Sequence, residues 1–229
     1  YYGSKDTKGG KATIRNKEEL DRILKELEGC TYQVEEVKKG ERIKKAPIPF
    51  TTSTLQQEAS KALNFSTQKT MRLAQQLYEG VEVKGHGTLG LITYLRTDST
   101  RIADEADAAA REFVKGHYGA DYVAQGSQAK TDNGKIQDAH EAIRPTDITL
   151  TPTIVKESLQ RDLFRLYQLI WKRFTASRMA SAVYETTSVK IEAGTHIFTT
   201  SASRLTFEGF MSVYVEADDE EEKNQVLGC

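Results

Sequence analysis

Strand-forming stretches lie at both ends of this chain of 229 residues, and helical periodicity fills the middle. Near the start, an extended stretch with Tyr32, Val34 and Val37 follows a short amphipathic helix over residues 17–28. Near the end, residues 184–192, 196–203 and 210–215 have the pattern of antiparallel strands, with Gly194 and Gly209 in the turns. We therefore expect an α+β protein in which both ends form one discontinuous, β-rich domain that carries an inserted helical domain.

The inserted segment begins near residue 46, after a charged connector over residues 38–45. Residues 53–64 and 66–78 each start with a serine that can cap a helix, and a tight turn joins the two predicted helices. A strand-like run over residues 89–95 follows. Helix, turn, helix and strand in this order predict a winged-helix-like module.

Two further helices are predicted in the second half of the inserted segment. The helix over residues 103–118 follows several possible capping side chains, and the helix over residues 158–178 has the strongest apolar face in the chain. Residues 124–135 between them are polar and lack periodicity, so we expect a mobile loop there.

Composition excludes several classes of protein. The longest apolar runs stop far short of the ~20 residues that a membrane helix needs, so we expect no membrane association. Two cysteines, Cys30 and Cys229, are too few for a four-thiolate zinc site or a disulfide framework. The same low cysteine count makes a reducing compartment the default expectation. No secretory signal opens the chain, and its start at Tyr1 instead of Met favours a truncated protein.

The charge is almost balanced, with a formal net charge of -1. The middle of the chain, residues 45–180, has 18 basic and 15 acidic side chains, whereas the acidic excess lies in the flanks. Much of that excess is an acidic run near the C-terminus that is typical of a solvated end. A nucleic acid would therefore be bound along a specific groove and not through bulk positive charge.

The densest polar cluster surrounds Tyr94, where the predicted strand gives way to a helix start. A helix N-terminus can bind phosphate, the hydroxyls of Thr97 and Ser99 can add donors, and Arg96 and Arg101 are planar cations suited to phosphate. Tyr94 lies two residues before Arg96 and so on the same face of a continuing strand. A phenol next to a cation can act as a nucleophile. The alternative is that Tyr94 packs at a strand end and the hydroxyls only cap a helix.

A second polar cluster surrounds His140. This imidazole can carry or donate a proton near neutral pH, Arg144 can hold a phosphate, and Asp138 or Glu141 can orient the ring. The alternative is a surface histidine in a polar turn. A metal site is not expected, because the other histidines fall in unrelated predicted elements. The chain also lacks a phosphate-binding loop of the Walker type and a G-x-S-x-G nucleophile elbow.

Three segments in order resemble the central part of bacterial type IA DNA topoisomerase I. They are residues 49–59 (PFTTSTLQQEA), 90–99 (GLITYLRTDS) and 138–146 (DAHEAIRPT). The similarity extends through residues 166–174 (LYQLIWKRF) and, more loosely, over nearly the whole chain. The resemblance implies a β-rich arch domain over residues 1–45 and 181–229, and a helical domain over residues 46–180 that bears the catalytic tyrosine.

The resemblance also implies the roles of individual residues. Tyr94 would attack one DNA strand and hold its 5′ phosphate, and Arg96 would contact the scissile phosphate. His140 and Arg144 match a motif near the active site of the family, where they would either hydrogen-bond the phosphate or have a structural role. Lys69 and Arg72 are weaker candidates for DNA contacts, and the alternative is that both simply face solvent.

The chain has no Asp-x-Asp-x-Glu motif, so the family's acidic Mg²⁺-binding domain has no counterpart in it. Its two cysteines are also too few for the family's zinc ribbons. We therefore expect an excised fragment with no bound metal, which cleaves DNA only together with the remaining domains of its enzyme. The implied partners are single-stranded and negatively supercoiled DNA, and the implied location is the bacterial cytoplasm, at the nucleoid. Two other hypotheses stay open: a non-catalytic winged-helix DNA-binding module, and an arch that binds a basic protein through its acidic end.

Overall fold

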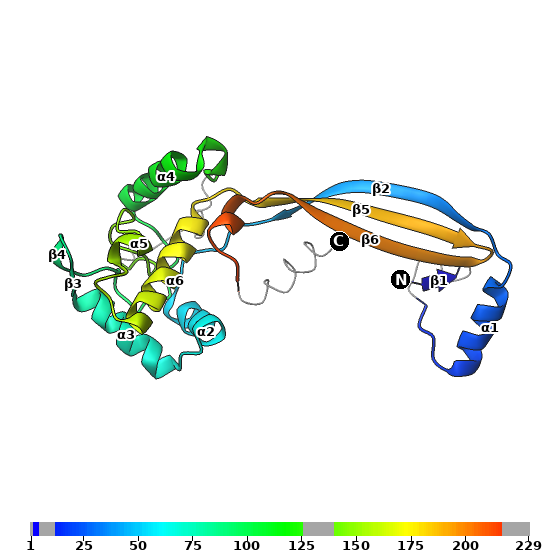
Figure 1. Cartoon of the computed structure of the whole chain (residues 1–229), viewed down its shortest axis with the longest axis horizontal. Coiled ribbons are helices and arrows are strands. Elements are labelled where there is room, and N and C mark those ends of the chain that lie inside the picture. The colour runs from blue at the N-terminus through cyan, green and yellow to red at the C-terminus, as the bar shows by residue number, and fades with distance from the viewer. Residues whose placement is uncertain (1, 5–11, 126–139, 217–229) are drawn as a thin grey trace. The chain divides into compact units, whose positions relative to one another are not determined.

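The chain, described here in a computed structural model, divides into two compact units. The first contains Tyr1–Ile43 and Val183–Thr206, and the second contains Lys44–Ala182 and Phe207–Cys229. The structure describes residues 2–4, 12–125 and 140–216. Each unit is a body of its own, coloured along the chain in Figure 1.

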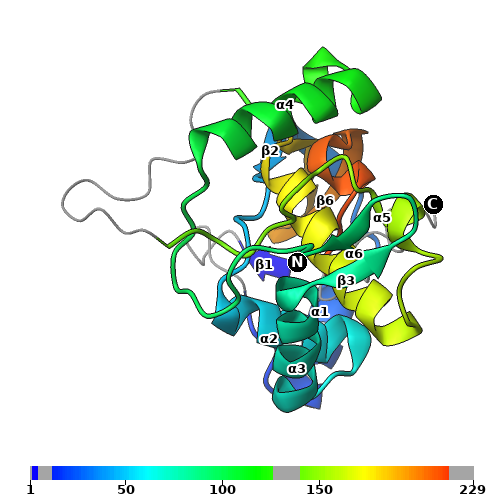
Figure 2. The same cartoon turned by 90° about the vertical axis from the view of Figure 1, so that its left-hand side faces the viewer.

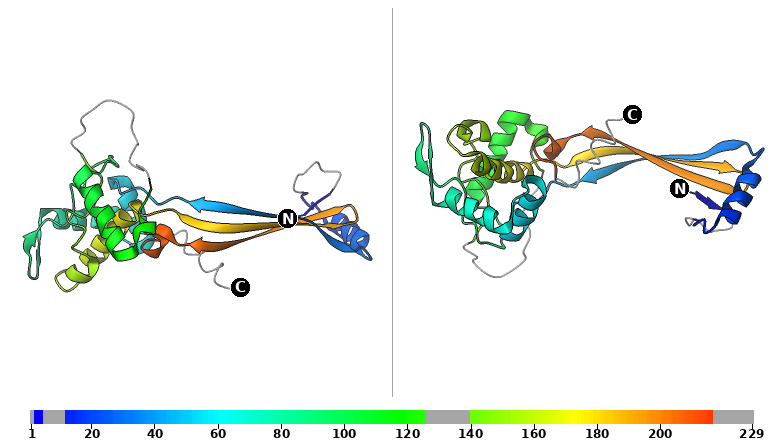
Figure 3. Two further views of the ribbon diagram at one scale, coloured as in Figure 1. Left: turned by 90° about the horizontal axis from the view of Figure 1, so that it is seen from above. Right: turned by 60° about the horizontal axis from the view of Figure 1, so that its bottom comes forward.

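The first unit is built on a four-stranded sheet with the strand order β1-β6-β5-β2. Its strands are β1 (Tyr2–Ser4), β2 (Tyr32–Lys44), β5 (Ala182–Ala193) and β6 (His196–Phe207). The three long strands run side by side in Figures 1 and 3, and β1 pairs antiparallel with the start of β6. Strands from both ends of the chain thus share one sheet.

The single helix described in this unit, α1 (Lys17–Leu27), begins as the sequence predicts. The side chain of Asn16 caps it by accepting a hydrogen bond from the amide of Glu19 at 2.8 Å. Ile23 is the buried side chain of α1.

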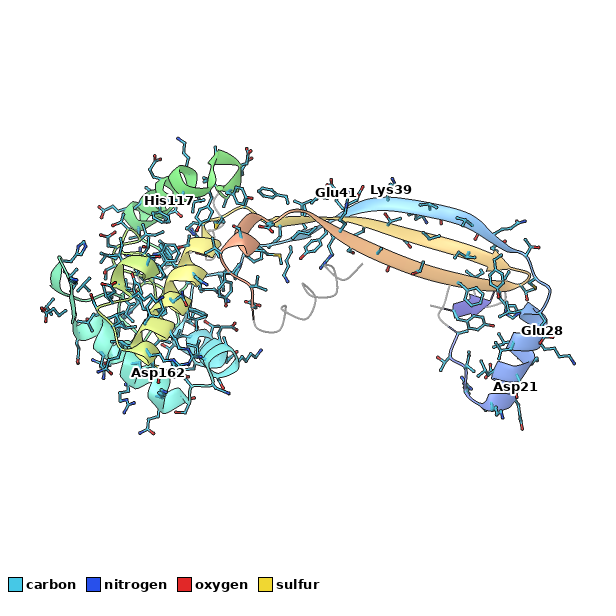
Figure 4. The ribbon with its side chains drawn as sticks, viewed as in Figure 1. Asp21, Glu28, Lys39, Glu41, His117 and Asp162 are labelled. Carbon is cyan, nitrogen blue, oxygen red and sulfur yellow. The ribbon has the colours of Figure 1, made fainter. Side chains whose placement is uncertain are left out.

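Strand β2 is longer than the sequence predicts, because the expected connector over residues 38–45 is largely its second half. The backbone of a strand pairs regardless of its side chains, and β2 is exposed at every position except Lys44. Lys39 and Glu41 accordingly project from it in Figure 4. Cross-strand contacts add to the pairing with β5: Lys190 Nζ lies 2.6 Å from Glu35, and the guanidinium of Arg42 lies 4.3 Å from the ring centre of Tyr184.

The second unit is mainly helical and holds most of the core. Its helices are α2 (Thr52–Leu63), α3 (Thr67–Glu79), α4 (Asp104–Tyr118), the short α5 (Pro152–Val155) and α6 (Arg161–Ser177). Two short 3-10 helices are η1 (Ala120–Tyr122) and η2 (Gly209–Ser212), and β3 (Val81–Val83) pairs with β4 (Gly87–Leu89) in a hairpin. Helix α6 lies in the middle of this unit in Figure 2 and contacts α2, α3, α5 and η2.

The apolar face predicted for α6 is the centre of this core. Leu166, Ile170 and Phe174 are at most 2% exposed, and the indole of Trp171 donates a hydrogen bond to the carbonyl of Ile148 at 2.9 Å. The helix begins at Arg161, three residues later than the pattern predicts, after Gln160 as its N-cap. Helix α3 matches its prediction, with Ser66 capping its start and Gly80 following its last residue.

The C-terminal part of the chain corrects two predictions. Residues 210–215 do not form a strand: η2 covers Gly209–Ser212, and Phe210, Met211 and Tyr214 are buried in the helical unit. Residues 207–216 therefore group with the helices, whereas the sequence places residues 181–229 in the β-rich domain. Gly209 explains the turn, since it has a φ of +50° and a Cβ there would lie 2.4 Å from the carbonyl oxygen of Ala180.

Two other predictions concern the start of α2 and the predicted loop over residues 124–135. Helix α2 begins at Thr52 with Thr51 as its N-cap, two residues before the predicted serine cap. The predicted mobile loop over residues 124–135 lies outside the described residues from position 126 on, as does most of the acidic C-terminal run.

Candidate active site

The segment that carries Tyr94 is irregular backbone and not the strand that the sequence predicts. Strand β4 ends at Leu89, and no helix or strand is formed again until α4 begins at Asp104. Ile92 makes only an isolated bridge to Pro145. The prediction that Tyr94 and Arg96 lie on one face of a strand is therefore wrong, and tertiary contacts determine their positions.

Two threonines anchor this segment through backbone hydrogen bonds on either side of Tyr94. Thr52, at the start of α2, donates its hydroxyl to the carbonyl of Leu95 at 2.7 Å and accepts from the amide of Thr97 at 2.9 Å. Its own amide donates to the carbonyl of Thr97 at 2.9 Å. Arg96, between those two residues, is thereby positioned against α2.

Thr93 forms the matching contact on the other side. Its hydroxyl donates to the carbonyl of Ala142 at 2.7 Å and accepts from the amide of Arg144 at 3.0 Å, while its amide donates to the carbonyl of Arg144 at 2.9 Å. The segment after His140 is thus fixed beside the segment of Tyr94, although about 50 residues separate them in the sequence.

Tyr94 presents its ring to solvent, with 43% of its surface exposed. Tyr78, at the end of α3, makes an edge contact with it, with ring centres 5.5 Å apart at an interplanar angle of 67°. The ring of His140 also lies close to Tyr94, with centres 6.4 Å apart. Tyr94 is thus near two other exposed rings.

Next to these rings lies a cleft of about 480 Å³ that is lined by polar and charged residues. Arg96, Thr97, Asp98 and His140 line one part of it, and the first turn of α2 lines the rest with Thr51, Thr52, Ser53 and Gln56. The structure therefore brings Arg96 and His140 into one site next to Tyr94. The helix N-terminus at this cleft belongs to α2, whereas the sequence predicts that of the helix after Tyr94. A helix start, a guanidinium and an imidazole together suit an anion such as a phosphate.

Thr97 and Ser99 do not cap α4, whose N-cap is Ala103 without a side-chain hydrogen bond. The hydroxyl of Thr97 accepts from the amide of Ser99 at 3.1 Å, and the hydroxyl of Ser99 accepts from the amide of Arg101 at 3.2 Å. Both side chains thus support the turn that follows Arg96. Thr97 is also part of the cleft lining, but it is only 9% exposed.

Arg144 forms an ion pair with the carboxylate of Glu141. Its Nε donates to Glu141 at 2.8 Å, a second nitrogen lies 2.6 Å from the same carboxylate, and a third donates to the carbonyl of Pro145 at 3.0 Å. Arg101 lies 3.9 Å from Glu141. Glu141 therefore interacts with two arginines. Asp138, the other residue expected to orient His140, lies outside the described residues.

Lys69 and Arg72 lie apart from this cleft, in the first half of α3, where they line a smaller hollow of about 220 Å³ with Ser66 and Gln68. The ammonium of Lys69 is 2.5 Å from Asp162, which Figure 4 labels at the start of α6. Lys69 is thus paired, whereas Arg72 is exposed.

In the part of the chain that the structure describes, His, Cys, Asp and Glu side chains form no group of three or more that could hold a metal ion. None of its helices is long and apolar enough to cross a membrane.

Several residues of this site have no functional role predicted from the sequence alone. Thr52, Ser53 and Gln56 lie in the first quoted motif, and only the fold shows that this motif meets Arg96. Tyr78 carries no local signal, since it is one of ten tyrosines.

Comparison with known proteins identifies the family. The sequence model of the family described as DNA topoisomerase matches residues 2–228, and the chain therefore belongs to this family. Full-length topoisomerase I from Thermotoga maritima, a solved structure, is 42% identical to this chain with a TM-score of 0.71. That match covers 84% of this chain but 31% of the Thermotoga chain, so this chain spans less than a third of its relative. The resemblance that the sequence motifs indicate is confirmed.

Proposed function

We propose that this chain carries the nucleophile of a type IA DNA topoisomerase, an isomerase that cleaves and rejoins one strand and relaxes negative supercoils. The observation that carries the proposal is the exposed phenol of Tyr94 beside a cleft in which Arg96 and His140 meet the start of α2. Membership of the DNA topoisomerase family supports it.

In the proposed reaction, Tyr94 Oη forms a bond to the phosphorus of one phosphodiester. The bond between that phosphorus and the 3′ oxygen breaks, and the 3′ oxygen takes up a proton. The 5′ phosphate stays on the tyrosine until the 3′ hydroxyl attacks it and restores the strand. One phosphodiester is exchanged for another, so rejoining requires no nucleotide hydrolysis.

The residues of the cleft suit this chemistry. Negative charge grows on the phosphoryl oxygens during the attack, and a cation placed there in advance stabilises the transition state. Arg96 has that role in the proposal. A phenol is mostly protonated near pH 7, so the attack also needs a group that accepts or shares the proton, and His140 beside the ring of Tyr94 is our candidate.

The order α2, α3, β3, β4 supports a winged-helix-like arrangement in which the hairpin of β3 and β4 is the wing. Such modules bind DNA through a helix and their flanking loops. Arg72, Lys69, Arg101 and Arg144 are secondary candidates for phosphate contacts, and the ion pairs of the last three would have to rearrange.

The rest of the catalytic apparatus is proposed to lie in other domains of the enzyme. Mg²⁺ would be held there, since the described residues here offer no suitable group of ligands. The first unit would act as the arch that lets the tyrosine-bearing unit move. We expect the chain alone to cleave DNA weakly or not at all, and the complete enzyme to act on single-stranded and negatively supercoiled DNA at the bacterial nucleoid.

A chimera tests the function. This chain replaces the matching part of Thermotoga maritima topoisomerase I, and the chimera is mixed with Mg²⁺ and an oligonucleotide labelled at its 3′ end, then denatured. Label on the protein is expected, because the fragment attached through its 5′ phosphate keeps the 3′ end. An oligonucleotide labelled at its 5′ end should leave the protein unlabelled.

Tyr94→Phe is the matched control, since it removes only the hydroxyl. Persistence of label in this variant would show that another residue is the nucleophile. A chimera that binds the oligonucleotide but is never labelled would favour the non-catalytic DNA-binding module.

A further inference from the structure

We infer that Tyr78 is a stacking platform for a nucleobase next to the phosphate handled by Tyr94 and Arg96. The inference rests on the proposed function in one respect, that the ligand is DNA. It adds a base-binding subsite to a site whose other described features suit the phosphate backbone.

The position of Tyr78 is set by its backbone. Leu73, Ala74 and Leu77 anchor α3 in the core, and the carbonyl of Leu77 accepts a hydrogen bond from the amide of Leu91 at 2.7 Å. Gly90 lies so close that a Cβ there would stand 2.7 Å from the carbonyl oxygen of Tyr78. The distance between the end of α3 and the segment that carries Tyr94 is therefore fixed by these backbone contacts.

The ring of Tyr78 is exposed although its backbone is fixed. It has 40% of its surface accessible, whereas two of the other tyrosines of this unit, Tyr167 and Tyr214, are at most 4% exposed. Those two engage their hydroxyls in the core, Tyr167 with the carbonyl of Leu150 at 2.6 Å and Tyr214 with Arg173 at 3.1 Å. Packing thus explains the buried tyrosines better than it explains Tyr78.

The geometry beside Tyr94 suits a single strand. Proteins that bind single-stranded DNA combine cations along the backbone with aromatic faces on which bases stack. Tyr78 touches Tyr94 edge to face, at an angle of 67°, so the two rings do not stack on each other. With a phosphate at Arg96 and Tyr94, the base of a neighbouring nucleotide lies within reach of the phenol ring of Tyr78.

The test compares two octanucleotides that have the same phosphates. One is dT8, and the other is an octamer of abasic tetrahydrofuran residues, each with a fluorophore for anisotropy at low salt and with the full chain. Tyr78→Ala is expected to weaken the binding of dT8 about tenfold and to leave the abasic octamer unaffected, because one base stack is lost. Tyr78→Phe should bind both like the unsubstituted chain.

Further variants separate stacking from other effects. Tyr78→Leu keeps apolar bulk without an aromatic face and should resemble Tyr78→Ala. Tyr32→Ala, which removes an exposed tyrosine in the other unit, should change neither affinity. Arg96→Ala should weaken both oligonucleotides equally, since it removes a phosphate contact.

The outcomes distinguish the inference from the proposed function. If Tyr78→Ala weakens both octamers equally, or neither, the stacking platform is wrong while DNA binding stands. If Tyr78→Leu binds dT8 like the unsubstituted chain, the side chain acts by bulk and the inference is also wrong. If the unsubstituted chain does not bind dT8 at all, the DNA-contacting role of this site fails, and the platform fails with it.

Discussion

The sheet unit and the helical unit bury their side chains to very different extents. Strand β2 is exposed at twelve of its thirteen positions, and the buried side chains described in its unit are few: Ile23, Tyr184, Ala193 and His196. In the helical unit, α6 alone buries eleven side chains. The sheet is held mainly by backbone pairing and cross-strand contacts, whereas the helical unit is held by apolar packing. The candidate site lies on the densely packed unit, where side chains can be positioned closely.

The largest effect is expected at the centre of the helical core. Phe174→Ala removes a ring that is 2% exposed and should lower the free energy of unfolding by about 4 kcal/mol, through lost burial and a cavity. The chain has a single tryptophan, Trp171 on α6, so its fluorescence during denaturation reports this unit. Val34→Ala on β2, at a side chain that is 61% exposed, is the matched control and should change stability by less than about 0.5 kcal/mol. Equal effects would contradict the contrast between the units.

A smaller effect is expected at Arg173, which connects α6 to two other segments of the helical unit. Its guanidinium donates to the carbonyl of Ile48 at 2.6 Å, contacts Glu216 at 2.6 Å and stacks over Phe50 at 4.7 Å. Arg173→Ala should cost about 2 kcal/mol, because these partners lose a buried donor. Arg204→Ala, at an exposed ion pair with Glu185 on the sheet, should leave the fluorescence transition unchanged.

Replacing Thr52 should lower the free energy of unfolding less than replacing Arg173, and should also change amide hydrogen exchange nearby. Thr52→Val keeps the shape of the side chain but leaves the carbonyl of Leu95 and the amide of Thr97 without their partner, at a cost of about 1 kcal/mol. Amide hydrogen exchange at Thr97 should become faster, and labelling of the chimera should fall. Thr52→Ser retains the hydroxyl and should restore both. Unchanged exchange in the valine variant would show that this contact does not hold the Arg96 turn.

The smallest effect should appear in acid, at Asp107 on α4. Burial raises the pKa of this carboxyl, but hydrogen bonds and attraction from Arg178 and Arg111 outweigh it and hold the pKa below its ordinary value. A lowered folded-state pKa contributes stability that is present above the ordinary value, near 4, and is lost as the pH falls through the lowered one. Asp107→Asn should therefore reduce stability at pH 6 and weaken its fall between pH 4 and pH 2, as followed by Trp171 fluorescence. An undiminished fall in this variant would assign the acid sensitivity to other carboxylates.

Local signals predicted the regular elements well where the stabilising contacts are themselves local. Ser66 and Gly80 bound α3, and Asn16 caps α1, because a cap involves residues three or four positions apart. The start of α2 was harder to predict, since four consecutive hydroxyl residues can cap it. The bonds of Thr52 to Leu95 and Thr97 favour Thr51 as the cap.

The apolar pattern predicted strands wrongly where a segment is buried by distant parts of the chain. Residues 210–215 alternate like a strand, but Phe210 and Tyr214 enter the helical core after the turn at Gly209. Residues 89–95 are rich in apolar side chains like a strand, yet they leave the hairpin at Leu89, and Leu91, Ile92 and Leu95 are buried in irregular backbone that bonds to α3 and to the segment after His140. Apolar periodicity records burial and does not by itself distinguish a strand from irregular buried backbone.

The sequence by itself determined the family, the identities of Tyr94, Arg96 and His140 as candidates, and the helices whose caps are local. Only the tertiary structure decided that the first turn of α2 faces Arg96 and that the segment after His140 lies beside the segment of Tyr94. The physical reason is distance along the chain. Caps and periodicity depend on neighbouring residues, whereas this site is assembled by hydrogen bonds and packing between segments more than 40 residues apart.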